Sequence, residues 1–105
     1  MSKAYWVAHV TVTDPARYAG YMELAPAAFK KYGARFLARG VDAQTLEGEA
    51  WQRHVVIEFD DMDRALACYN SPEYRAARAL REGVCKASVT LVNGLGDQGH
   101  GTGQP

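Results

Sequence analysis

The sequence predicts an α+β domain with the element order β-α-β-β-α-β, the split pattern of ferredoxin-like folds. Four segments rich in β-branched and aromatic residues alternate with period two, and two longer segments repeat apolar residues at spacings of three and four. Glycines stand where one period changes to the other. With 105 residues, 48% of them hydrophobic, the chain has material for one core and one domain. We expect an antiparallel sheet with two helices on one face.

The first strand is predicted over residues 5–12, where aromatic and β-branched residues alternate with small or polar ones. Asp14 and Pro15 then provide a helix N-cap and a proline at the first helical position. The apolar positions of the helix that follows, which ends at Gly33, are Tyr18, Met22, Ala25, Phe29 and Tyr32. Because Pro26 lacks an N–H to donate, we expect a kink there or a break into two short helices.

The second strand is predicted over 34–39, with a continuation at 44–47 after an irregular turn, and the third over 53–59. The second helical region begins at Asp60 or Asp61 and runs to about Gly83.

Ser71 and Pro72 interrupt this second helical region and restart it, with the serine as the new cap. The last strand is predicted over 88–92. We expect the domain to cover residues 1–94, and residues 95–105 to be a flexible glycine-rich tail with no pattern that could bury surface.

The alternation of the strands predicts two different sheet faces. The apolar face, which should carry the helices, collects Trp6, Ala8, Val10, Val12, Ala34, Phe36, Ala38, Val55, Ile57, Phe59, Val89 and Leu91. The mixed face collects Tyr5, Val7, His9, Thr11, Arg35, Leu37, Arg39, His54, Val56, Glu58, Ser88, Thr90 and Val92. Its apolar members are too many to leave in water, so we expect a second copy of the chain to cover this face in a homodimer.

The composition of the chain argues against nucleic acid and membrane partners. Lys and Arg number 12 and Asp and Glu number 12, so no net field attracts nucleic acid or an anionic membrane. No apolar run approaches the ~18–20 residues of a membrane helix. Cys68 and Cys85 lie in unrelated contexts, as reduced thiols do. We expect a cytoplasmic protein with no cofactor, no metal, no nucleic acid partner and no membrane partner.

Several short motifs carry a resemblance to a known family. They are Val12-Thr13-Asp14-Pro15 followed by Tyr18 and Tyr21, Arg35-Phe36-Leu37-Ala38-Arg39-Gly40, Leu46-Glu47-Gly48, Val55-Val56-Ile57-Glu58-Phe59 and Cys68-Tyr69-Asn70-Ser71-Pro72-Glu73-Tyr74. With them, residues 3–94 resemble the family called domain of unknown function 1330. The resemblance implies a dimeric α+β barrel, the superfamily that also holds cofactor-independent monooxygenases, haem-degrading enzymes and muconolactone isomerases.

The chain departs from the family pattern at two positions. Val41 follows Gly40 where a second glycine is common, which bears on the hairpin, and Cys68 stands where the family often has Trp, which would enlarge a pocket. The resemblance supplies no reaction.

The first candidate site lies on the mixed face. In the split topology His9, Glu58 and Arg39 come from three adjacent strands, so the carboxylate could link an imidazole and a guanidinium. In an enzyme Arg39 would hold a substrate anion and His9 or Glu58 would act as the base. The alternative is a charge network that only satisfies the interior of a dimer interface.

The second candidate site surrounds the break at Pro72, where Tyr69, Ser71 and Tyr74 could face a cleft between helix and sheet. Tyr69 would donate a hydrogen bond, and an apolar wall would come from Trp6, Tyr18 and Phe36. The alternative is that these aromatic residues are ordinary core.

Two functions remain open at this point. One is a cofactor-independent enzyme of the monooxygenase or isomerase type that binds a small aromatic or carboxylated molecule. The other is a non-catalytic binding or assembly module. The pocket would lie either between helix and sheet or inside the barrel.

Overall fold

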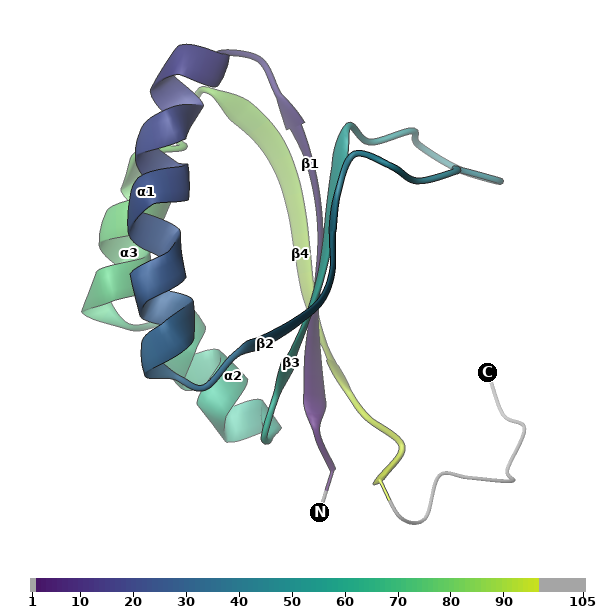
Figure 1. Cartoon of the computed structure of the whole chain (residues 1–105), viewed down its shortest axis with the longest axis vertical. Helices are drawn as coiled ribbons and strands as arrows, with labels where there is room; N and C mark the ends of the chain where they lie inside the picture. The colour runs from purple at the N-terminus through teal and green to yellow at the C-terminus, as the bar shows by residue number, and fades with distance from the viewer. Residues whose placement is uncertain (1, 97–105) are drawn as a thin grey trace.

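The computed structural model describes residues 2–96 and consists of one four-stranded antiparallel sheet with three helices on one face (Figure 1). In chain order the elements are β1 (Ala4–Val12), α1 (Pro15–Lys31), β2 (Arg35–Gly40), β3 (Arg53–Phe59), α2 (Met62–Tyr69), α3 (Pro72–Ala79) and β4 (Cys85–Asn93). The strands are arranged β2-β3-β1-β4, which is the predicted split topology.

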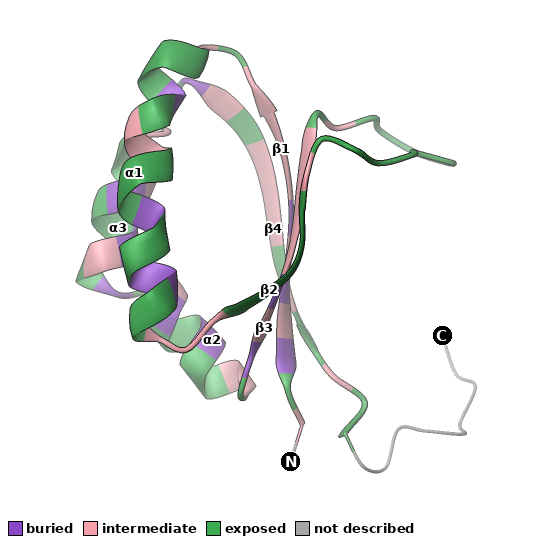
Figure 2. Ribbon diagram, viewed as in Figure 1, coloured by how far each residue is buried: buried purple, intermediate pink, exposed green. Residues whose placement is uncertain are grey.

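The core lies between the sheet and the helices, where buried residues appear on both layers (Figure 2). Trp6 of β1 is opposite Ile57 of β3 and Leu91 of β4, so one face of the three strands is continuously apolar. Trp6 and Ile57 are fully buried, as is Tyr74 from α3. Small residues such as Ala28 let α1 approach these large side chains closely.

Helix α1 begins as predicted, since the Asp14 carboxylate accepts a hydrogen bond from the Arg17 amide at 3.3 Å. It then continues through Pro26 to Lys31, so the expected division into two short helices does not occur. The proline removes only one hydrogen bond of the helix, and the burial of Ala25 and Phe29 on either side holds both halves against the sheet.

The second helical region is divided where the sequence predicts it. Ser71 Oγ accepts from the Tyr74 amide at 3.0 Å and donates to the Cys68 carbonyl at 2.7 Å. It therefore ends α2 and caps α3 at once, and Pro72 occupies the first position of α3. This junction fixes the direction in which Tyr74 enters the core.

Strand β2 departs from the prediction through a β-bulge. Phe36 is opposite Ile57, but the next pairs are Ala38 with Val56 and Arg39 with Val55, so Leu37 is the extra residue. Alternation after the bulge is therefore reversed. Ala38 lies on the open face of the sheet and Arg39 on the helix face, the opposite of the predicted assignment of both.

Residues 41–52 connect β2 to β3 without a strand, so the predicted continuation at 44–47 is absent. This loop extends from the side of the sheet opposite the helices (Figure 1). Several of its side chains and those of the open face are apolar and exposed, with Leu37 at 56%, Leu46 at 85% and Val92 at 47%.

Beyond β4 the Gly94 amide donates to the Lys3 carbonyl at 2.7 Å, close to the predicted domain end. The predicted tail, 95–105, lies outside the described residues apart from its first two. In the described part of the chain, no helix has the length and apolar character needed to cross a membrane.

Candidate functional site

A cavity of about 490 Å³ opens between α1 and the helix face of the sheet. Its volume is within the range of small-molecule pockets. Its apolar wall includes Trp6, Ala25, Phe29, Phe36, Ile57 and Val89. Its polar groups come from Tyr18, Tyr21, Tyr74, Arg39, Arg53 and Arg81, with His54 at the border. None of the described residues that line the cavity is acidic.

Aromatic contacts make the apolar end of the cavity rigid. The ring of Trp6 meets those of Phe29 and Tyr74 edge to face, with centroids 5.0 and 5.1 Å apart. Phe29 makes a similar contact with Phe36 of β2 at 5.5 Å. Such pairs stabilise beyond the area that they bury, so this wall is formed before any ligand arrives.

Tyrosine hydroxyls line the side of the cavity formed by the helices. The hydroxyls of Tyr21 and Tyr74 are 2.8 Å apart and share a hydrogen bond. Burial, reinforced by Tyr74, raises the pKa of Tyr21 far above its ordinary value. Burial also raises the pKa of Tyr18. The hydroxyls of Tyr18 and Tyr21 are therefore neutral near pH 7 and can donate a hydrogen bond.

The arginines of the cavity come from three elements. Arg39 reaches the helix face because of the bulge at Leu37, and Arg53 begins β3 opposite Val10. Arg81 follows α3, and its guanidinium lies over the Tyr21 ring at 5.4 Å. Sequence analysis did not assign Arg53 or Arg81 to a site.

Signals for both arginines were present in the sequence. Arg53 shares the period-two face of Val55 and Ile57, and Arg81 follows Tyr74 and Ala77 at helical spacing.

His9 and Glu58, predicted as alternative bases, lie on the open face of the sheet, away from this cavity. His9 Nδ1 is 3.0 Å from His54 Nδ1, and its ring stacks on Trp51 of the β2–β3 loop with centroids 6.1 Å apart. Glu58 is opposite Tyr5, four residues along β1 from His9. That spacing corresponds to about 13 Å, so the predicted chain from His9 to Glu58 does not form.

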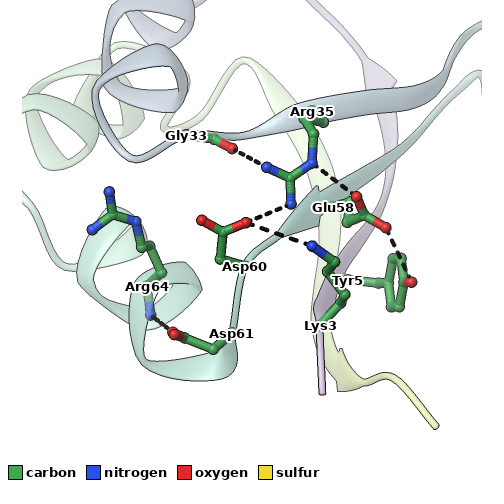
Figure 3. Close-up of polar contacts among 8 residues, drawn as sticks. All are labelled: Lys3, Tyr5, Gly33, Arg35, Glu58, Asp60, Asp61 and Arg64. Atoms are coloured by element: carbon green, nitrogen blue, oxygen red, sulfur yellow. Dashed lines mark hydrogen bonds and ion pairs between the residues drawn. The ribbon is translucent and has the colours of Figure 1, made fainter. Parts of the chain in front are cut away.

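Glu58 pairs with Arg35 and not, as predicted, with Arg39. Arg35 Nε donates to Glu58 at 2.8 Å and Nη2 donates to Asp60 at 2.9 Å, while the Tyr5 hydroxyl donates to Glu58 at 3.2 Å (Figure 3). The register is the reason, because Arg35 lies directly opposite Glu58, and the bulge that follows turns Arg39 to the helix face, opposite Val55.

The Arg35 network joins strand β2 to its neighbours. The hydrogen bond from Arg35 is the main cause that lowers the pKa of Glu58, and it likewise lowers the pKa of Asp60. Arg35 also donates to the Gly33 carbonyl at 3.2 Å, and Lys3 lies 3.7 Å from Asp60 (Figure 3). Both carboxylates are therefore charged near pH 7 and fix the edge of the sheet.

Two further predicted site residues also lie away from the cavity. The Tyr69 hydroxyl accepts from Arg78, whose guanidinium lies 5.0 Å from the tyrosine ring centroid. Ser71 is buried and occupied by the helix junction. The cavity thus brings together Trp6, Tyr18, Phe36, Tyr74 and Arg39 of the predicted set, and leaves out Tyr69, Ser71, His9 and Glu58.

Among the residues that the structure describes, no three His, Cys, Asp or Glu side chains gather closely enough to hold a metal ion. The cavity contributes only arginines and tyrosines as charged or polar side chains, together with His54 at its border. Its chemistry is that of hydrogen-bond donors in an apolar wall.

Comparison with known proteins shows a family and a fold. The family model described as domain of unknown function (DUF1330) matches residues 3–95. No curated protein matches the chain.

Solved structures share the fold at low sequence identity. A protein of unknown function from Rhodopseudomonas palustris, RPA0582, superposes with a TM-score of 0.73 at 15% identity, over 87% of this chain and 81% of that one. SnoaB, a cofactor-independent oxygenase from Streptomyces nogalater, gives 0.64 at 13%, over 88% and 92%. A dimeric protein of unknown function with a ferredoxin-like fold from Bacteroides fragilis gives 0.59 at 16%, over 86% and 94%.

Proposed function

Because the chain belongs to the family described as domain of unknown function DUF1330, a description that names no reaction, we propose its function from its geometry: it binds a small organic molecule in the cavity between α1 and the sheet. The observation that carries this proposal is the cavity itself, which combines a rigid aromatic wall with a few convergent hydrogen-bond donors.

The bound molecule would touch residues from every layer of the fold. Trp6 and Phe36 offer apolar contact, while Tyr18, Tyr74 and Arg39 offer donors. Of the two locations left open by the sequence, this one is supported by a cavity within a single chain.

Fluorescence of the neutral dye phenylnaphthylamine, which brightens in apolar surroundings, tests the proposal. Met22 lines the cavity and is half-exposed, so Met22→Trp should fill the entrance without overpacking the core. We expect this variant to weaken dye binding about tenfold or more, a loss of about 1.4 kcal/mol.

Leu24→Trp is the matched control. Leu24 is similarly exposed on α1 but does not line the cavity, so this variant should bind the dye like the wild type. Absence of dye binding, or equal affinity in the wild type and Met22→Trp, would contradict the proposed site.

The enzymatic form of the proposal is a cofactor-independent oxygenase or isomerase. SnoaB, which shares the fold, is described as a cofactor-independent oxygenase. In this chain, arginines beside an apolar wall would stabilise negative charge that develops on a substrate. Within the cavity Tyr21 or Tyr74 would donate a hydrogen bond to that charge, since burial keeps Tyr21 neutral.

This enzymatic form is separated from simple binding by turnover. A bound molecule that is recovered unchanged after incubation with the protein in air assigns the cavity to binding alone. A product whose formation is lost in Met22→Trp supports the enzyme.

We also propose that the protein is a homodimer formed through the open face of the sheet. Exposed Leu37 and Val92, with half-buried Val7 and Val56 between them, form an apolar area that another sheet would cover. Leu37→Asp would place a charge in that interface, so the dimer should dissociate in sedimentation velocity. A dimer that persists in this variant would place the interface elsewhere.

A further inference from the structure

The three arginines of the cavity have no carboxylate partner in the described part of the chain. The ion pairs there use Lys3, Lys31, Arg35 and Lys86 as cations. No acidic side chain from residues 2–96 lines the cavity either. The cavity therefore carries excess positive charge, although the chain as a whole is formally neutral.

Arg53 provides the most specific sign of a missing partner. Its Nε atom is buried and has no hydrogen-bond partner in the structure. Its guanidinium lies 5.7 Å from the ring centroid of Tyr18, which is itself buried. Leaving a buried donor unpaired costs free energy, and an acceptor bound in the cavity would remove that cost.

Arg81 approaches the same region from the helix side. Its Nη2 is 3.5 Å from the Tyr74 hydroxyl, and its guanidinium lies over Tyr21. Although burial raises the pKa of Tyr18, the charges of both Arg53 and Arg81 act on this hydroxyl in the opposite direction. The two guanidinium groups therefore both lie close enough to the Tyr18 hydroxyl to act on it.

Arg39 joins them from the neighbouring strand. It is opposite Val55, which makes it the diagonal neighbour of Arg53 on the same face. Diagonal neighbours are roughly 7–8 Å apart, within reach of long side chains. Only the bulge at Leu37 brings Arg39 to this face.

The strand register separates the cavity into two ends. Arg53 lies opposite Val10, near the end of β1 where α1 begins, and Arg39 lies two residue pairs away, opposite Val55. Four residues back along β1, Trp6 lies opposite Ile57 and contacts Phe29. Arg53 and the aromatic end are thus about 13 Å apart along the strand, and Arg39 lies between them, with its guanidinium 4.7 Å from the Phe36 ring centroid.

We infer that the ligand is an apolar carboxylate, with its carboxylate between Arg53, Arg39 and Arg81 and its apolar body against Trp6 and Phe29. This inference rests on the proposed binding function and names its ligand class. The planar fork of an arginine matches the two oxygens of a carboxylate, and the hydroxyl of Tyr18 adds a neutral donor. The aromatic and aliphatic remainder of the wall suits a hydrocarbon body.

Isothermal titration with naphthoate and naphthamide tests the inference, because the two probes share one aromatic body and differ in charge. We expect naphthoate to bind about tenfold or more tightly than naphthamide. Added salt should weaken only naphthoate. Arg53→Gln should reduce naphthoate affinity to that of naphthamide and leave naphthamide affinity within about twofold.

Two further variants keep the test decisive. Arg39→Gln, at an exposed position that tolerates substitution, should also weaken naphthoate selectively, and it replaces Arg53→Gln if that protein fails to fold. Arg75→Gln removes an exposed arginine of α3 that does not line the cavity, and it should change neither affinity.

Equal affinity for the two probes, absence of naphthoate binding, or naphthoate affinity unchanged in both Arg53→Gln and Arg39→Gln would overturn the inference. If phenylnaphthylamine still binds and is blocked by Met22→Trp, the proposed function survives that result. If the dye does not bind either, both fail.

Discussion

Removal of the Tyr74 hydroxyl tests the hydrogen bond that closes the helix side of the cavity. In Tyr74→Phe the ring stays in the core, where it is fully buried, but the Tyr21 hydroxyl loses its partner at 2.8 Å. A net hydrogen bond contributes about 0.5–1.5 kcal/mol, and a partner left unpaired in a buried place costs about 1–3 kcal/mol. We therefore expect the free energy of unfolding to fall by about 1–3 kcal/mol.

Urea denaturation followed by circular dichroism measures this loss, with an unchanged m-value as the sign that the folded state is intact. For a domain of this size each 1 kcal/mol corresponds to about 4–8 °C in the melting temperature. Tyr32→Phe is the control, since the Tyr32 hydroxyl makes no hydrogen bond among the described residues, and it should stay within about 0.5 kcal/mol of the wild type.

A double-mutant cycle gives the result that would refute the reasoning. With both hydroxyls removed in Tyr21→Phe/Tyr74→Phe, no unpaired tyrosine hydroxyl remains, so the double variant should cost clearly less than the sum of the two single variants. Additivity within about 0.5 kcal/mol would mean that the two hydroxyls do not interact.

Three further predictions concern titratable groups. Because Arg35 lowers the pKa of Glu58 below its ordinary 4.5, this pair stabilises the fold above that pH, and the effect is lost as pH falls through the lowered pKa. In Glu58→Gln the melting temperature should therefore depend less on pH in acid than in the wild type, and an unchanged dependence contradicts this. Because burial raises the pKa of Tyr21 above 10.0, stability should fall as pH rises beyond that value, and Tyr21→Phe should weaken this dependence; equal alkaline profiles contradict it. Because burial raises the pKa of Cys68 to about 12, a thiol reagent should not modify Cys68 in the native protein at neutral pH, and rapid labelling located by mass spectrometry would contradict this.

Most of the fold was predictable because its signals are local. The third strand was expected over 53–59 and has these bounds, since its β-branched run Val55-Val56-Ile57 is followed by Phe59 and then by two aspartates that start a helix. The junction at Ser71 and Pro72 was equally readable, because a cap residue followed by proline allows few other conformations. Of the two alternatives expected at Pro26, a kink or a break, the break does not occur, because the cost of the proline is local whereas the burial that outweighs it is tertiary.

The candidate site was harder to predict because it depends on one backbone irregularity. The segment Arg35-Phe36-Leu37-Ala38-Arg39 does not indicate which of its residues is the bulged one, left without a partner on β3. Every register of the strand would place some apolar residue against the helices. Arg35 lies opposite Glu58, before the bulge, and pairs with it. A regular strand would have continued to place Arg39 opposite His54 on the open face, whereas the bulge places it opposite Val55, where it faces the cavity.

The bulge decides on which face of the sheet Arg39 lies, and so how charge is divided between the two faces. Glu58 lies on the open face with Arg35, so its negative charge is neutralised there and does not reach the cavity. Arg39, which pairs with no carboxylate of the described residues, joins Arg53 and Arg81 on the helix face, where tyrosine hydroxyls, aromatic rings and aliphatic side chains line the cavity. A single extra residue in an edge strand thus separates a paired, structural arginine from an unpaired one. Leu37, the residue that the bulge leaves over, stays exposed on the open face, where the proposed second copy would cover it.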